Sequence, residues 1–272
     1  MKLTYLGTAA AEGFPAVFCK CKYCNEARVL KGKNIRTRSQ AIINDDLLID
    51  LPADTYHHFL ENDIEGDKIK YLLVSHSHQD HFYYDELKMR HAPYSHDMSA
   101  DILELYCGQG VYSKVMEMGV PENVSLTLLK PFVSVAIGDY TVTPLPARHY
   151  KGDDALIYLI SDGKKNLLYA HDTGYFFDEV IVYLKDNQIK LDMISFDCTN
   201  IDIPIPDSDS HMGLENIERL ANVLSNNGNI TPSTIKFINH FSHNANPTHH
   251  VLEKRVENMG LNVSYDGCVV NI

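Results

Sequence analysis

Three histidines and one aspartate fall within six consecutive positions of this chain, His76-Ser-His78-Gln-Asp80-His81. The apolar run just before them, residues 71–74, predicts a short buried strand, so the cluster follows the strand's C-terminal end. Loops at that end form the binding sites of layered α/β folds. Imidazoles and carboxylates are the ligands that zinc and similar transition metals take. The cluster therefore predicts a metal site, and the alternative is a polar loop that happens to be rich in histidine.

A second cluster, Cys19-Lys-Cys21-Lys-Tyr-Cys24, places three thiols within six residues near the N-terminus. In a cytosolic protein, where thiols stay reduced, this density predicts a thiolate site for a structural zinc, with a fourth ligand from elsewhere in the chain. A redox pair of Cys21 and Cys24 is the alternative, but it leaves Cys19 without a role. The other three cysteines are isolated and are expected to be small buried apolar residues.

Net charge and the distribution of apolar residues limit the partners and the compartment. The 272 residues carry a formal net charge of −12, which argues against a broad basic surface for nucleic acid or anionic lipid. The N-terminus does not resemble a signal peptide, and no run approaches the ~20 apolar residues of a membrane span. We therefore expect a cytoplasmic protein with no membrane partner, whose cysteines are reduced or bound to metal.

Predicted strands and helices alternate along both halves of the chain, and several strands end in a histidine or an aspartate. His149, Asp172 and His240 each follow such a strand. The pattern predicts an α/β (α+β) fold, an αββα sandwich of two mixed sheets flanked by helices. We expect one domain, residues 1–272, with a zinc-binding cysteine loop at 19–24. Strands are predicted at 2–6, 47–50, 71–74, 156–160, 166–170, 191–196, 234–238, 262–265 and 268–271, and helices at 54–62, 83–90, 109–118, 176–187 and 247–259.

The order of these motifs resembles that of the metallo-β-lactamase superfamily of binuclear hydrolases. The residues that carry the resemblance are His76, His78, Asp80, His81, His149, Asp172 and His240. The resemblance implies a first metal at His76, His78 and His149, and a second at Asp80, His81 and His240. It implies that Asp172 bridges the two metals.

Further residues match supporting positions of the same family. Asp50, at the end of a predicted strand, resembles the aspartate that supports the metal site from behind the ligands; Leu51-Pro52 follow it here, where the family usually has small residues. His211 matches a histidine that faces the substrate, and we expect it to act as an acid or as a donor to a phosphoryl oxygen. Its alternative role is a structural one near the start of the next helix. Asp80 and His211 are the expected catalytic residues.

The cysteine cluster narrows the resemblance to a subgroup. Together with His240-Phe-Ser-His243 and Tyr265-Asp-Gly267, it resembles the PhnP-type phosphodiesterases of carbon–phosphorus lyase systems. That likeness implies a structural zinc held by Cys19, Cys21, Cys24 and His243, and it implies a homodimer. The pyrroloquinoline-quinone biosynthesis protein B group shares the cysteine cluster but has a degraded hydrolase motif, whereas the motif here is complete.

These expectations converge on a metal-dependent hydrolase that cleaves small, including cyclic, phosphodiesters with a hydroxide shared by two zinc or manganese ions. Nucleic acid is not the expected substrate. The alternatives are an RNA-processing nuclease, a thioester or lactam hydrolase, and a non-catalytic relative. The remaining helical histidine pairs are expected to be exposed and without a chemical role; they are His57 with His58, and His249 with His250.

Overall fold

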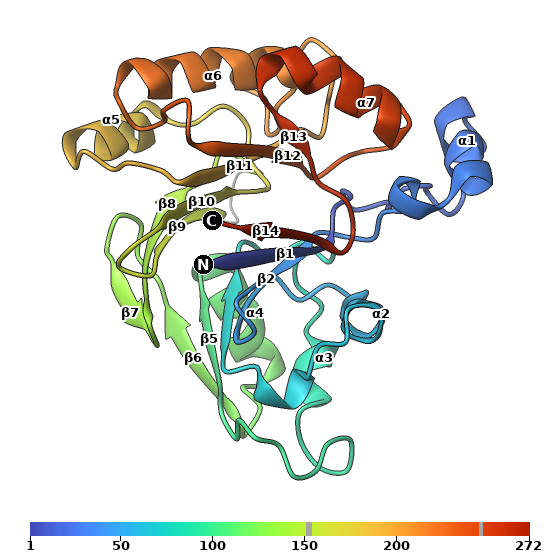
Figure 1. Ribbon diagram of the computed structural model, residues 1–272. Helices are drawn as coiled ribbons and strands as arrows, with labels where there is room; N and C mark the ends of the chain where they lie inside the picture. The colour runs from blue at the N-terminus through green and yellow to red at the C-terminus, as the bar shows by residue number, and fades with distance from the viewer. Residues whose placement is uncertain (151–153, 245–246) are drawn as a thin grey trace.

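A computed structural model describes residues 1–150, 154–244 and 247–272 of the chain. Two seven-stranded sheets pack face to face, and helices cover the outer face of each sheet (Figure 1). Helices α5, α6 and α7 lie over one sheet, and α2, α3 and α4 lie beside the other (Figure 1). The predicted αββα layering is confirmed.

The first sheet joins the two ends of the chain, because β14 pairs antiparallel with β1. Its other half is parallel, since β3, β4, β5 and β6 run in the same direction. In spatial order its strands are β14 (Cys268–Asn271), β1 (Lys2–Gly7), β2 (Gln40–Ile43), β3 (Leu47–Ile49), β4 (Tyr71–Val74), β5 (Leu103–Cys107) and β6 (Val124–Leu128).

The second sheet is also mixed. Strands β10, β11, β12 and β13 are parallel, and β8 runs with them because it is separated from β10 by the antiparallel β9. In spatial order its strands are β13 (Asn262–Val263), β12 (Ile235–Asn239), β11 (Met193–Asp197), β10 (Asn166–Ala170), β9 (Leu156–Ser161), β8 (Tyr140–Pro146) and β7 (Val135–Ile137).

The helices differ from the sequence prediction at two places. The cysteine cluster is not all loop, because Cys21 caps a helix that contains Cys24. The helix predicted at 83–90 is only one turn long. The α-helices are α1 (Lys22–Leu30), α2 (Thr55–Glu61), α3 (Asp85–Lys88), α4 (Gln109–Met118), α5 (Asp178–Asp186), α6 (Leu214–Asn226) and α7 (His249–Val256).

The core between the sheets is rich in tyrosine. Tyr5 of β1 and Tyr158 and Tyr169 of the opposite sheet are fully buried among aliphatic side chains. A buried hydroxyl needs a partner. The Tyr5 hydroxyl therefore lies 2.6 Å from Ser195 Oγ, and the Tyr158 hydroxyl donates to the carbonyl oxygen of Val74 at 2.6 Å. These bonds tie the two sheets together just behind the edge where the predicted ligands lie.

The expectation that both helical histidine pairs are exposed is wrong for one member of each pair. His58 and His249 are buried, whereas His57 and His250 are exposed. His58 Nδ1 lies 2.6 Å from Gln40 Oε1, and its Nε2 lies 2.6 Å from a threonine hydroxyl. Burial lowers the pKa of His58 to about 4, so this ring is neutral in the folded protein.

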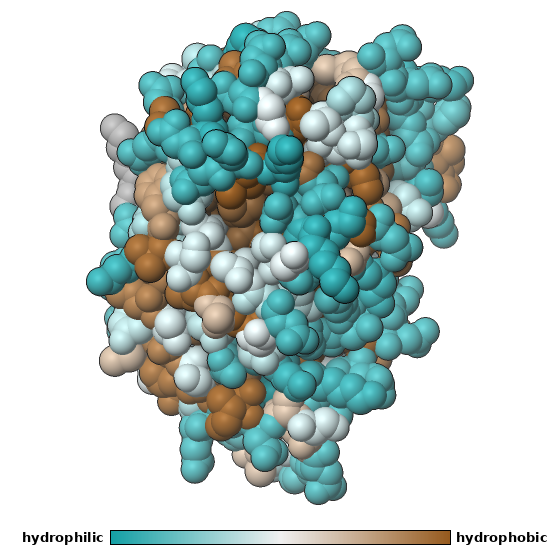
Figure 2. Space-filling model, turned by 60° about the vertical axis from the view of Figure 1, so that its left-hand side comes forward, coloured by the Kyte–Doolittle hydropathy of each residue, from teal (hydrophilic) through white to brown (hydrophobic). Residues whose placement is uncertain are grey.

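Hydrophilic residues cover most of the face seen in Figure 2, and apolar residues gather on its left side and in a hollow near the upper centre. The helices of the described ranges 1–150, 154–244 and 247–272 are all too short or too polar to span a bilayer.

Candidate metal centre

Parallel strands bring the predicted ligands to one edge of the sandwich. Because β8, β10 and β12 run in the same direction, His149, Asp172 and His240 follow strand ends on the same side. In the other sheet β3 and β4 are parallel, so Asp50 and His76 also leave their strands together. The edge where both sets meet carries the candidate metal centre.

The first group of side chains consists of His76, His78 and His149. Nδ1 of His78 lies 3.0 Å from Nε2 of His76 and 3.1 Å from Nε2 of His149. Nitrogen ligands at ~2.05 Å from a tetrahedral zinc ion would be about 3.3 Å apart. The three rings are therefore spaced as ligands of one ion would be. Burial lowers the pKa of His76, which keeps that ring in the neutral, metal-binding form.

The second group consists of Asp80, His81, Asp172 and His240, all of them buried. The Nε2 atoms of His81 and His240 are 3.2 Å apart. Oδ2 of Asp80 lies 3.4 Å from Nε2 of His81, and Oδ2 of Asp172 lies 3.6 Å from Nε2 of His240. Burial would raise the pKa of the Asp80 carboxyl, but His81 and His240 outweigh this and hold the pKa well below its usual range.

Asp172 lies between the two groups. Its Oδ2 faces the second group, and its Oδ1 lies 3.5 Å from Nδ1 of His149 in the first. Asp172 Oδ1 and His211 Nδ1 are only 2.7 Å apart, yet neither buried atom has a partner with hydrogen-bonding geometry in the described part of the chain. A buried carboxylate oxygen in this arrangement fits a metal ligand.

Asp50 lies behind the ligands, in the position expected from the sequence. Its fully buried carboxylate accepts a hydrogen bond from the Ser75 amide at 2.8 Å and lies 2.7 Å from Nδ1 of His81. This contact leaves Nε2 of His81 free to face the second group. The unusual Leu51 continues the same wall, because its amide donates to the His81 carbonyl oxygen at 2.7 Å. The presence of leucine here, where the family usually has a small residue, thus does not displace Asp50.

Asp197 is a site residue that the sequence analysis missed. It is the last residue of β11, it is fully buried, and its Oδ2 lies 3.4 Å from Nδ1 of His240 and 3.5 Å from Nδ1 of His211. Its Oδ1 accepts hydrogen bonds from the amides of Thr199 and Met212. Its place at the end of a strand parallel to β10 and β12 was the signal that could have found it.

His211 is the most accessible of the charged groups here, with a side chain 25% exposed against 4% for Asp172 and 0% for Asp197. Burial would lower the pKa of His211, but the two carboxylates outweigh it and raise the pKa to about 11. His211, directly after the loop 201–210, therefore lies against the second group and is accessible to solvent, as expected for a side chain that contacts a substrate.

The cysteine cluster meets His243 across the molecule. Ligand atoms of Cys19, Cys21, Cys24 and His243 all lie within 4.8 Å of one another, and Cys21 Sγ is 3.7 Å from His243 Nδ1. A sulfur at ~2.3 Å and a nitrogen at ~2.05 Å from a tetrahedral zinc would be about 3.6 Å apart. The contact with His243 lowers the pKa of the Cys21 thiol to about 6, which favours the thiolate. All six cysteines are free of disulfides.

Charge balance also fits bound cations. Asp50, Asp80, Asp172 and Asp197 bring four buried carboxylates into one cluster of histidines. Buried carboxylates are costly unless a positive charge or a metal compensates them. The donor set of imidazoles and carboxylates is one that divalent transition metals fit.

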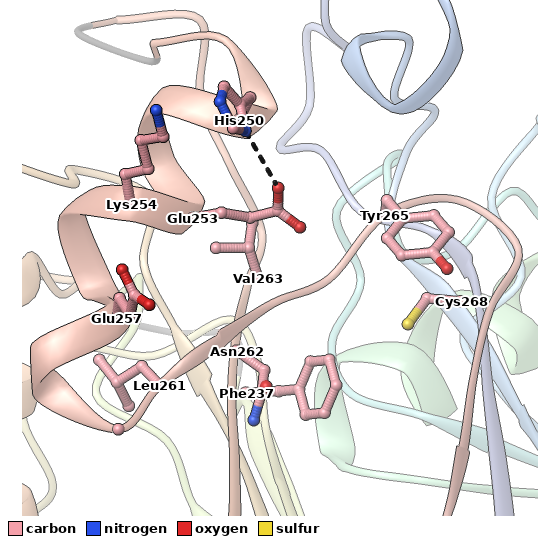
Figure 3. A pocket seen from close by; sticks show the side chains of 11 residues that line it. Phe237, His250, Glu253, Lys254, Glu257, Leu261, Asn262, Val263, Tyr265 and Cys268 are labelled. Carbon is pink, nitrogen blue, oxygen red and sulfur yellow. Dashed lines mark ion pairs between the residues drawn. The ribbon is translucent and has the colours of Figure 1, made fainter.

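A hollow of about 780 Å³ lies elsewhere, between α7 and the edge strands β13 and β14. Figure 3 shows His250, Glu253, Lys254 and Glu257 on the helix side and Tyr265 and Cys268 opposite them. Its described lining includes none of the grouped ligand side chains. The candidate metal centre therefore does not coincide with this hollow.

Comparisons with known proteins agree with this geometry. A family model described as a beta-lactamase superfamily domain matches residues 48–230, more than half of the chain. No curated protein matches the sequence.

Among solved structures, Zn²⁺-bound PqqB from Methylobacterium extorquens is similar, with a TM-score of 0.77 at 18% identity over 100% of both chains. A new diphosphatase from the PhnP family is similar with a TM-score of 0.75 at 18% identity, over 100% of this chain and 97% of that one. The metallo-β-lactamase fold protein YhfI from Bacillus subtilis has a TM-score of 0.72 at 16% identity over 99% of both. These likenesses show the fold, and the family match shows that the chain belongs to the β-lactamase superfamily of metal-dependent hydrolases.

Proposed function

We propose that this protein is a metal-dependent phosphodiesterase that acts on small phosphodiesters. One observation carries the proposal: two groups of buried and half-buried ligand side chains meet at Asp172, beside a partly exposed histidine that lies against two carboxylates. The likeness to a diphosphatase from the PhnP family supports a phosphate ester as the substrate class.

His76, His78 and His149 would hold one divalent ion, and Asp80, His81 and His240 would hold a second, with Asp172 between them. Two such ions supply a hydroxide nucleophile near neutral pH and neutralise charge on the reacting phosphate. Two divalent ions would offset the buried carboxylates of Asp50, Asp80, Asp172 and Asp197, so that these groups would not repel a diester monoanion from an otherwise acidic protein.

His211 would assist departure of the leaving group. Its Nδ1 lies against Asp172 and Asp197, so these carboxylates orient the ring and leave its other nitrogen for the substrate. From there it can donate a proton to the departing alkoxide or a hydrogen bond to a phosphoryl oxygen. Asp197 also reaches His240, and so it would position an acid and a ligand together.

The cysteine cluster would hold a structural zinc with His243. His243 lies three positions after His240, and the Glu12 carboxylate accepts hydrogen bonds from the hydroxyl of Ser242 and the amide of His243. A zinc at this point would brace the loop that carries a catalytic ligand, because structural zinc sites contribute directly to the stability of the folded state.

The decisive experiment is a turnover assay on metal-replete protein with bis(4-nitrophenyl) phosphate, a small cyclic phosphate, a thioester and a β-lactam. We expect turnover of the phosphodiesters only. Faster turnover of the thioester or the lactam would contradict the proposal.

The likeness to PqqB favours a second candidate, a metal-binding protein without hydrolase activity. Full metal occupancy without turnover of any ester in the panel would support that alternative.

A further inference from the structure

A second hollow, here called the side pocket, adjoins the metal centre. It measures about 570 Å³, within the usual range for small-molecule sites, and His149 forms part of its wall. Because the same ring faces His78 at 3.1 Å, a group attached to a phosphate at the first metal position would reach the side pocket directly. The side pocket lies between the ends of β6 and β8 and the starts of α4 and α5.

The walls of the side pocket are mostly apolar. Charged side chains in its described lining are Lys130 and Asp154, which have opposite signs. Gly108 allows the start of α4 to lie close to the backbone of Asp154, since a Cβ there would lie only 2.7 Å from the Asp154 carbonyl oxygen. The apolar lining side chains include Leu128, Leu129, Pro131, Pro146, Leu156 and Phe177. An uncharged group fits these walls better than a second phosphate does.

Tyr150 forms part of the lining on the side of the metal centre. Tyr150 is 69% exposed, and its ring centroid lies 6.1 Å from that of His78. A second ring that covered this exposed tyrosine, next to a ligand histidine, would remove its apolar face from water. Planar rings stack on tyrosine regardless of their detailed chemistry.

We propose that the side pocket binds a planar, uncharged ring attached to the phosphodiester, either an aryl group or a nucleobase. This inference rests on the proposed phosphodiesterase function and specifies its substrate class. The phosphate would lie at the metal groups, and the ring would enter between Leu128, Phe177 and Tyr150.

Two diesters that share the leaving group test the proposal, phenyl 4-nitrophenyl phosphate and methyl 4-nitrophenyl phosphate. The wild-type kcat/KM should favour the phenyl ester by roughly tenfold or more. Leu128→Asp places a charge in the side pocket and should bring this ratio toward one. The matched control is Leu60→Asp on α2, at a leucine that is 61% exposed and lies outside the side pocket, and it should leave the wild-type ratio unchanged. Comparing variants cancels the intrinsic reactivities of the two esters.

Calorimetric titration of metal-replete protein gives a readout that does not need turnover. Phenylphosphonate should bind about tenfold more tightly than methylphosphonate, and Leu128→Asp should abolish the difference. Adenosine 5′-phosphate against ribose 5-phosphate tells a nucleobase from a simple aryl group, because only a nucleobase pocket favours the first of this pair.

The outcomes separate the two proposals. Equal kcat/KM values and equal affinities for phenyl and methyl compounds would overturn the side-pocket inference while leaving the phosphodiesterase standing. Absence of turnover together with tighter phenylphosphonate binding would overturn the phosphodiesterase and support the ring pocket. An unchanged phenyl preference in Leu128→Asp would also overturn the inference.

Discussion

The substitution Asp197→Asn tests whether the carboxylate at the end of β11 positions the centre. Asparagine keeps nearly the same shape and one acceptor oxygen for the Thr199 and Met212 amides, but it removes the charge facing His211 and His240. Unit charges about 3.5 Å apart interact by roughly 5 kcal/mol at an effective dielectric constant near 20. Neighbouring Asp172 compensates part of that loss for His211, because it lies at 2.7 Å.

Residues that orient metal ligands from behind typically change activity or metal affinity about 10- to 100-fold when substituted. We therefore expect Asp197→Asn to lower kcat for a phosphodiester by about 10- to 100-fold, equivalent to roughly 1.4–2.8 kcal/mol. Steady-state kinetics gives this number, and metal analysis by mass spectrometry shows whether the second ion is retained.

Asp192→Asn is the matched control. Asp192 precedes the same strand, but its carboxylate accepts hydrogen bonds from Lys165 Nζ and the Asn166 amide at the opposite end. We expect activity within about twofold of wild type, because this half-exposed pair contributes little. Equal kcat values for Asp197→Asn, Asp192→Asn and wild type would refute the positioning role of Asp197.

Three further predictions concern metal content, the acid and stability. Protein purified without chelator should hold close to three divalent ions per chain by elemental analysis. Cys21→Ser should lower this number to two and lower Tm in calorimetry. A wild-type content near one ion per chain would contradict the binuclear site. His211→Ala should lose turnover of an unactivated diester by about 100-fold or more while its metal content stays unchanged; full activity of the variant would rule out the acid role. The pKa of His58 is depressed to about 4 in the folded protein, so the unfolded chain binds this proton first and stability falls as pH drops from about 6.5 to 4, by roughly 3 kcal/mol for this group. Urea titrations over this pH range should show a shallower fall of the free energy of unfolding in His58→Gln than in wild type. Parallel curves of this free energy against pH would count against the buried, neutral state of His58.

Much of the centre could be predicted because its residues follow strands that the local pattern reveals. Residues 71–74 and 166–170 are short apolar runs, and the ligand-type residues just beyond them are visible without any tertiary contact. Parallel pairing then brings such strand ends together, so ligand-type side chains gather around His76 and Asp172. The layered fold follows from the same alternation of strands and helices.

Tertiary structure alone decided the burial and the partners of side chains whose contacts come from distant parts of the chain. His58 is buried because Gln40 and Thr37 pair with both of its ring nitrogens, and no periodicity in a seven-residue helix encodes those contacts. Asp197 became a site residue only when β11 was placed between β10 and β12. The sequence by itself determined which groups can bind metal and in what order they occur, since residue chemistry and strand propensity are local. Which carboxylate lies behind which ligand, and that a side pocket adjoins His149, depend on how two sheets pack, and that depends on the whole chain.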